Sequence, residues 1–343
     1  MRVLVCGVTG LVGGAITRHL LSAGHSVRGL SRSAERATGL FASQEDGRRA
    51  LAEGRLSFVQ GDVTSPSSLP RAVEDVQAVV QAAQFERAPV EDPAHALTYE
   101  RVDRDGTVNL LHAIAETCRA QAPAGAAARQ SAFSSHFLYM SGITVSAEAP
   151  EPWNRAKWQA EEAIRGSGLD WTIVRCCWAY GPADKALNRL LGYSDYLPFV
   201  PLFGPGRELL TPVFVEDVGR LFVRLVAEAD KSRSTLFRLG GPDTVTLDGF
   251  LRAALAAMGR RRPLLHIPKA LAKSQARLLQ HLPGRPLTPD AVDFVTQGGA
   301  VETPDRELIA DRFPGFSPTA LSDGLEAYLR RDRSGPHMPR YLA

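Results

Sequence analysis

The sequence "GVTGLVG" at residues 7–13 constrains the fold most, because it follows the apolar run "RVLVC" directly and leads into a helical pattern. In such a strand, turn and helix, Gly7 allows the tight turn and Gly13 lets the helix pack closely against the strand. Gly10 lets the backbone approach a pyrophosphate, which the free N–H groups of the helix N-terminus attract. The pattern favours a dinucleotide site, and a glycine turn with a purely structural role stays the alternative.

Beyond this turn, short β-rich runs alternate with amphipathic helical patterns. Continuous apolar strands between such helices predict a parallel sheet that is covered on both faces. We therefore expect an α/β protein with a Rossmann-type doubly wound parallel sheet. The runs that carry this prediction include "SVRGLSR", "LSFVQGDV", "AVVQAA", "GTVNLLHAIAETC", "HFLYMSG" and "WTIVRCCW".

The pattern also divides the chain. We expect a dinucleotide-binding domain over residues 1–185, to which residues 212–241 return. Residues 186–211 and 242–330 are expected to form a smaller substrate-side cap, followed by a tail at 331–343. The Ala-, Gln- and Ser-rich residues 119–134 lack clear periodicity and are expected to form a surface excursion.

Composition excludes several classes of protein. The chain has 343 residues, 44% of them hydrophobic, and a formal charge of +3 from 40 basic and 37 acidic residues, so we expect a sizeable core and no nucleic-acid partner. The N-terminus resembles neither a signal peptide nor a transmembrane segment, so we expect a cytoplasmic protein. Four cysteines, at 6, 118, 176 and 177, have no CxxC spacing, and no histidine cluster suggests a metal.

The second β-rich run ends in Ser31 and Arg32, where NAD-binding proteins of this type usually have an acidic residue. A guanidinium at this place suits a 2′-phosphate, so we expect NADP(H) to be preferred over NAD(H), although Arg32 as a solvated strand-end charge stays open. Asp62 follows the third strand and is expected either to accept from the adenine amino group or to cap its loop. The remaining residues expected to contact the cofactor are Thr9, Leu11, Val12, Val63, Ala82 and Ala83.

In order and approximate spacing, these motifs resemble the short-chain dehydrogenase/reductase superfamily in its extended and atypical branches. The motifs are "GVTGLVG", "GDV", "AAQ", "RVDRDGTVNLL", "LYMSG", "NRAK", "RCCWAYGP", "PVFVEDVGRLF" and "FRLGGPDTVTL". Within this superfamily, the chain is most similar to the NAD(P)H-binding group that includes the respiratory complex I accessory subunit and related bacterial proteins.

The resemblance implies a catalytic tyrosine, a lysine four residues later that also holds the ribose, and a serine or threonine that binds the substrate oxygen. Lys157 occupies the lysine position, but Trp153 occupies that of the tyrosine and Gly142 that of the serine. The usual tyrosine mechanism is therefore excluded. Ser141 and Thr144, beside Gly142, are the candidate replacement donors, with Tyr139 and Tyr180 as further candidates.

Two functions follow as hypotheses. The first is an NADPH-dependent reductase of a hydrophobic ketone or quinone-like compound, for which solvent supplies the proton. The second is a non-catalytic NAD(P)H-binding accessory or redox-sensing subunit. The segment "IPKALAKSQARLLQHLPGR" has the pattern of an amphipathic helix that contacts a membrane surface or partner, although we favour a cap helix over the cleft. The sequence leaves the oligomeric state open.

Overall fold

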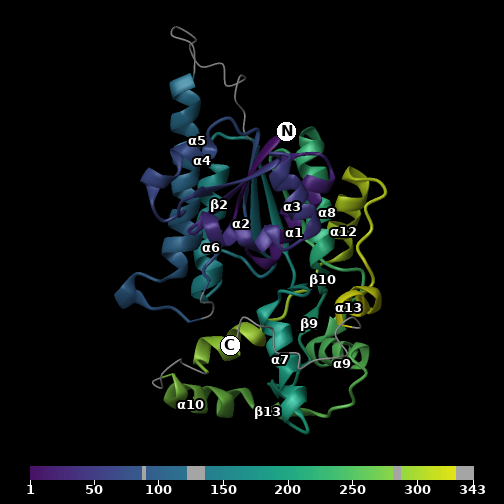
Figure 1. Ribbon diagram of the computed structural model, residues 1–343. Helices are drawn as coiled ribbons and strands as arrows, with labels where there is room; N and C mark the ends of the chain where they lie inside the picture. Colours follow the sequence, from purple (N-terminus) through teal and green to yellow (C-terminus); the bar gives the residue numbers. More distant parts are fainter. Residues whose placement is uncertain (87–89, 122–135, 281–286, 330–343) are drawn as a thin grey trace.

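The computed structural model describes residues 1–86, 90–121, 136–280 and 287–329, and its centre is a seven-stranded parallel sheet (Figure 1). The strand order is β11-β6-β5-β4-β1-β2-β3, and every neighbouring pair is parallel. This arrangement confirms the predicted doubly wound fold. The strands are β1 (Arg2–Cys6), β2 (Ser26–Ser31), β3 (Leu56–Gln60), β4 (Ala78–Gln81), β5 (His136–Gly142), β6 (Trp171–Cys176) and β11 (Thr235–Leu239).

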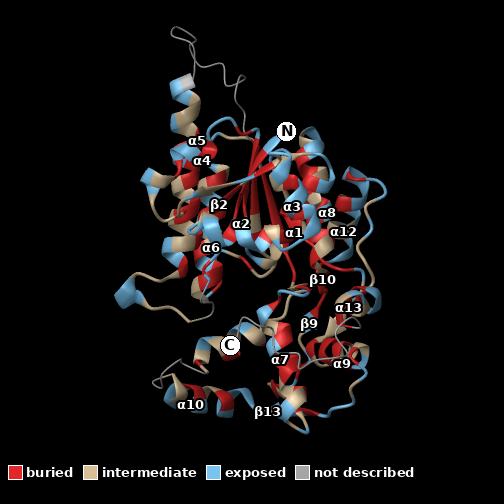
Figure 2. Ribbon diagram, viewed as in Figure 1, coloured by how far each residue is buried: buried red, intermediate tan, exposed pale blue. Residues whose placement is uncertain are grey.

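The sheet is buried between two layers of helices, as Figure 2 shows by the red strands at its centre. On one face, apolar side chains of α1 (Leu11–Ser22), α8 (Val215–Ala227) and α12 (Thr303–Arg312) share a core with the strands. On the other face, α4 (Pro70–Val73), α5 (Gly106–Gln121) and α6 (Pro152–Arg165) do the same. Burial of both faces explains why the strands read as continuous apolar runs.

The strand order reverses beside β1, which lies between β2 and β4. Cys6 is aligned with Leu30 of β2 and with Gln81 of β4, so the three strands end at nearly the same level. In open parallel sheets, ligands bind in the crevice at the carboxyl ends of the strands where the order reverses. The glycine turn, Arg32 and Ala82 all follow directly on these strand ends.

A second lobe with its own apolar core lies beyond this edge of the sheet. It contains the helices α7 (Lys185–Tyr196), α9 (Leu247–Ala257), α10 (Lys269–Leu279), α11 (Pro289–Val295) and α13 (Leu321–Leu329). Its short strands are β8 (Val200–Phe203), β9 (Leu209–Leu210), β12 (Val245–Thr246) and β13 (Leu264–Ile267). The remaining elements among the described residues are α2 (Ala34–Ala42), α3 (Glu45–Ala52), β7 (Ala179–Tyr180) and β10 (Val213–Phe214), together with short turns of 3-10 and π-helix.

The predicted amphipathic segment begins as helix α10. Its small residues Ala272 and Ala276 are buried against Val292 of α11, whereas Leu271 and Leu278 are exposed. Among the described residues, no helix has both the length and the apolar character needed to cross a lipid bilayer. Residues 122–134 of the predicted excursion and the tail at 331–343 lie outside the described residues.

Candidate functional site

The glycine turn has the strand, turn and helix that the sequence predicts, and close backbone packing requires glycine at two of its positions. Gly7 has a φ of +78°, and a Cβ there would lie 2.7 Å from the backbone oxygen of Ala82. A Cβ at Gly13 would lie 2.2 Å from the backbone oxygen of Gly7. Neither position has space for a side chain, so these two glycines hold the helix, the turn and the end of β4 close together.

Gly10 differs from the other two glycines. Among the described residues, the only atom within 4 Å of a Cβ at Gly10 is the Gly7 oxygen, at 3.2 Å. Gly10 is exposed and serves as the N-cap of α1, with no cap from any described side chain. Packing therefore does not explain this glycine, but an anion held close to the backbone at the helix N-terminus does. The turn fits the pyrophosphate of a dinucleotide.

The other predicted cofactor contacts next to the turn are exposed or half-buried. Thr9 is exposed, Leu11 and Val12 are half-buried, and the small side chains of Ala82 and Ala83 follow β4 at the reversal of strand order. These residues lie at the strand ends that a cofactor would cross.

At the end of β2, Arg32 forms an ion pair with Glu86, and 66% of the Arg32 side chain is exposed. The Ser31 hydroxyl donates to the backbone oxygen of Ser33. The Asp62 carboxylate accepts from the Thr64 N–H at 2.8 Å, which is the contact expected of a loop cap, and Val63 is buried behind it. No local sequence pattern marks Glu86 as the partner of Arg32.

Lys157 lies in α6, and its Nζ is 2.8 Å from Oδ1 of Asp103. The two side chains are 12% and 0% exposed, respectively. Burial is the largest single effect and would lower the pKa of Lys157. The charge of Asp103, its hydrogen bond to the ammonium and the acidic groups of Tyr139 and Glu161 together outweigh burial, so the pKa is raised and the ammonium keeps its charge. The ammonium also lies 5.6 Å from the centre of the Tyr139 ring.

Asp103 is the most important residue of the site that sequence analysis missed. It belongs to a short π-helix (Glu100–Asp105) before α5, and its Oδ2 accepts from the backbone N–H of Phe85 at 3.0 Å. Single turns of π-helix occur often at functional sites. Because Lys157 is far along the chain, no local pattern marks the pair.

Trp153 fills the position of the family's tyrosine and is only 5% exposed. Its ring centre lies 6.0 Å from that of Tyr99 and 5.4 Å from that of Phe294 in α11. Its indole N–H donates to Gln297 at 3.0 Å. Side chains of the second lobe therefore cover and hold the residue at the centre of the predicted catalytic site.

The candidate replacement donors either donate hydrogen bonds elsewhere or are buried. Ser141 donates to the fully buried carboxylate of Glu161 at 2.6 Å, and Glu161 also accepts two hydrogen bonds from Arg175. Thr144 donates to Asn154 at 3.1 Å. Tyr139 and Tyr180 are fully buried, and burial raises the pKa of both phenols. Ser141 and Thr144 thus already donate their protons within the protein, and the two phenols are buried with raised pKa values, so none of the four is placed as a ready proton donor or acceptor.

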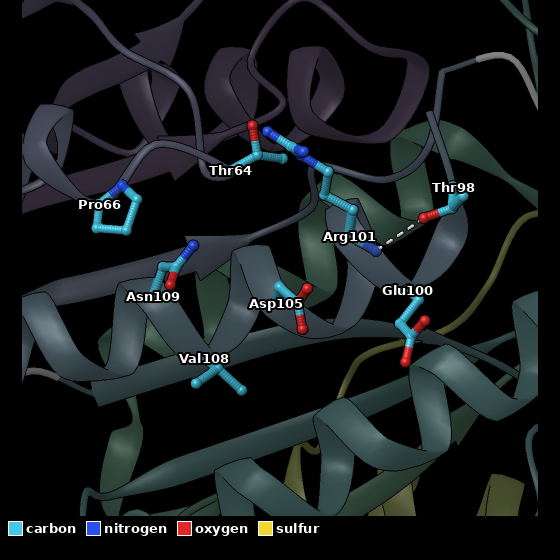
Figure 3. Close-up of a pocket in the computed structure, with 8 residues that line it drawn as sticks. All are labelled: Thr64, Pro66, Thr98, Glu100, Arg101, Asp105, Val108 and Asn109. Atoms are coloured by element: carbon cyan, nitrogen blue, oxygen red, sulfur yellow. Dashed lines mark hydrogen bonds between the residues drawn. The ribbon is translucent and has the colours of Figure 1, made fainter. Parts of the chain in front are cut away.

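A polar surface depression of about 370 Å³ lies next to the loop that follows β3 (Figure 3). In Figure 3 the side chain of Arg101 extends toward Thr64, across the opening between this loop and the π-helix. The depression contains none of the predicted site residues and is separate from the glycine turn. Its lining residues are Thr64, Pro66, Thr98, Glu100, Arg101, Asp105, Val108 and Asn109.

The part of the chain that the structure describes offers neither a metal site nor a disulfide. It contains no group of three or more histidine, cysteine or acidic side chains arranged to hold a metal ion. All four cysteines lie in that part and are free thiols.

The fold and the glycine turn define a dinucleotide-binding protein of the Rossmann type. A family model described as NAD(P)H-binding matches residues 7–191. The chain belongs to this NAD(P)H-binding family and is an atypical member of the extended short-chain dehydrogenases/reductases.

Two curated relatives come from energy-converting systems. One is subunit 9 of the NADH dehydrogenase [ubiquinone] 1 alpha subcomplex, a mitochondrial protein of Arabidopsis thaliana, which is 30% identical over 41% of this chain and 35% of its own length. The other is the photosystem II assembly factor Ycf39 of Synechocystis, which is 31% identical over 51% of this chain and 44% of its own length. The matches thus span less than half of each of these relatives.

Solved structures resemble the chain over its whole length. A double mutant of the dTDP-glucose 4,6-dehydratase DesIV of Streptomyces venezuelae, with NAD bound, has a TM-score of 0.72, 19% identity and full coverage of both chains. The UDP-glucuronic acid 4-epimerase of Bacillus cereus has a TM-score of 0.67 and 18% identity over 96% of this chain and 99% of its own. At these identities the likeness shows the fold alone.

Proposed function

We propose that this protein binds NADPH without carrying out tyrosine-dependent redox chemistry, and that it acts as an accessory or redox-sensing component of a larger assembly. The observation that carries this proposal is the buried ring of Trp153 at the tyrosine position, held by Gln297 and covered by Phe294. An indole N–H donates hydrogen bonds but does not serve as an acid or base. The relatives named as a respiratory subunit and as an assembly factor support such a role.

In this proposal, the cofactor is held by residues of the nucleotide-binding domain. The turn at Gly10 and the N-terminus of α1 bind the pyrophosphate, Arg32 pairs with the 2′-phosphate, and Lys157 donates to ribose hydroxyls. The bound nicotinamide would supply a hydride donor or acceptor. Asp103 keeps the Lys157 ammonium charged and in a fixed place, so it remains a donor at neutral pH.

A reductase of a hydrophobic ketone or quinone-like compound is the second candidate. It is favoured by the retained glycine turn and by the fixed, charged Lys157, because positioning of the nicotinamide can contribute more to the rate than general acid catalysis. A delocalised acceptor would tolerate a proton supplied by solvent. For this reaction the substrate must reach the nicotinamide, although Phe294 and Gln297 pack against Trp153.

Binding and turnover assays separate the two candidates. We expect saturable NADPH binding by fluorescence titration, and no NADPH oxidation above the background rate with a panel of quinones and aromatic ketones. The Gly10→Val variant serves as the background control, because it should bind no nucleotide. Saturable oxidation by the unmodified protein that disappears in this variant would contradict our proposal and favour the reductase.

The preference for NADPH depends on Arg32. We expect tighter binding of NADPH than of NADH, and the Arg32→Ala substitution should remove about 1–3 kcal/mol of that preference by deleting a charge-assisted contact. Arg32→Lys keeps the charge but loses the planar pair of donors. Its preference for NADPH should therefore lie between that of the unmodified protein and that of Arg32→Ala. Calorimetric titration with both nucleotides provides the measurement. Equal affinities in the unmodified protein would refute the assignment.

A further inference from the structure

We propose that the Glu86 carboxylate occupies, on Arg32, the place that the 2′-phosphate of NADPH would take. Glu86 thereby lowers the affinity for NADPH and leaves the affinity for NADH unchanged. This inference rests on the proposed function, because it assumes that NADPH binds at the glycine turn. It adds a specificity-determining residue that opposes Arg32, the residue expected to favour the phosphate.

The first support is the place of the ion pair in the fold. Arg32 follows the end of β2 and Glu86 follows β4, whereas β1 and the glycine turn lie between these two strands. The Arg32 guanidinium donates to the Glu86 carboxylate, so the pair spans the end of β1. A nucleotide that crosses the strand ends and presents a 2′-phosphate to Arg32 must meet this pair.

The second support is the charge around Glu86. Its pKa is lowered first by the hydrogen bond from Arg32, and the charges of Lys185 and Arg36 lower it further. These three cations come from the end of β2, from α2 and from the start of α7. Asp62 is the other acidic group that acts on Arg32. The Glu86 carboxylate is thus paired with Arg32 and also experiences the positive charge of two further segments, and a phosphate dianion at the same place would be attracted in the same way.

The third support is that the pair can be displaced. The side chains of Arg32 and Glu86 are 66% and 56% exposed, and exposed pairs of this kind are weak because water screens them. Breaking the pair should therefore reduce the affinity for NADPH only a few-fold. Repulsion between the carboxylate and the incoming phosphate adds to that cost until Glu86 moves away.

The test uses ligands that differ only in the 2′-phosphate. Calorimetry would compare NADPH with NADH, and adenosine 2′,5′-bisphosphate with 5′-AMP, for the unmodified full chain and for Glu86→Gln. We expect Glu86→Gln to bind NADPH and the bisphosphate about 3–10-fold more tightly, and to bind NADH and 5′-AMP as before. The gain should become smaller in the Arg32→Ala background, where only the repulsion between Glu86 and the phosphate is left to relieve, and it should shrink as ionic strength rises.

Glu53→Gln is the matched control. Glu53 also pairs with arginines, but it precedes β3 and so lies at the amino ends of the strands, whereas Arg32 and Glu86 follow the carboxyl ends. This substitution should change none of the four affinities. An equal gain for all four ligands in Glu86→Gln, a loss of NADPH affinity or no change would each overturn the inference. If no nucleotide binds to the folded, unmodified protein, the proposed function fails, and this inference fails with it.

Discussion

Gly10→Val is expected to weaken NADPH binding at least about 100-fold while the chain stays folded. Gly10 has φ −80° and ψ 171°, an extended conformation that β-branched residues adopt readily. Among the described residues, a Cβ there approaches only the Gly7 oxygen, at 3.2 Å. The free energy of unfolding should therefore fall by only about 1 kcal/mol. The isopropyl group would instead fill the space in which the pyrophosphate meets the helix N-terminus.

Gly13→Val is the contrasting control, because its Cβ would lie 2.2 Å from the Gly7 oxygen and should disrupt the turn itself. Circular dichroism and thermal unfolding would report the fold, and calorimetry would report the binding of NADPH. A folded Gly10→Val variant with unchanged NADPH affinity would show that the turn has only a structural role.

The sequence predicted what local patterns determine. A strand, a turn with a positive φ at Gly7 and a helix follow one another within a few residues, so their backbone requirements are visible in the glycine spacing. The parallel sheet was predictable for a similar reason, because burial on both faces imposes continuous apolar strands. The position of Lys157, by contrast, came from the resemblance to a family.

Contacts between distant segments were not predictable. Asp103 and Lys157 lie on different helices, and only the packing of α6 beside the π-helix brings them together. Ser141 was an attractive donor from its place next to the family's serine position. Its engagement with Glu161 depends on how α6 covers β5, which leaves no periodic signal in the sequence.

The second large effect is expected for Lys157→Ala. Asp103 is fully buried, and loss of the ammonium would leave its carboxylate without a counter-ion. Breaking a buried pair by removing one partner destabilises a protein by about 3–5 kcal/mol. We therefore expect a clear drop in the denaturant midpoint. A loss of NADPH binding in this variant alone would not distinguish a missing ribose contact from a damaged site.

The double variant Lys157→Met with Asp103→Asn makes that distinction, because it removes both charges and keeps similar volumes. The amide oxygen introduced by Asp103→Asn can still accept from the Phe85 N–H, as the Asp103 carboxylate does now. We expect the double variant to regain most of the stability that Lys157→Ala loses, because no buried charge is left unpaired. If Lys157 holds the ribose, NADPH affinity should nevertheless fall about tenfold, the effect of losing one charge-assisted hydrogen bond. Wild-type affinity in a stable double variant would exclude Lys157 from the cofactor site, and wild-type stability in Lys157→Ala would mean that the ion pair contributes little to the fold.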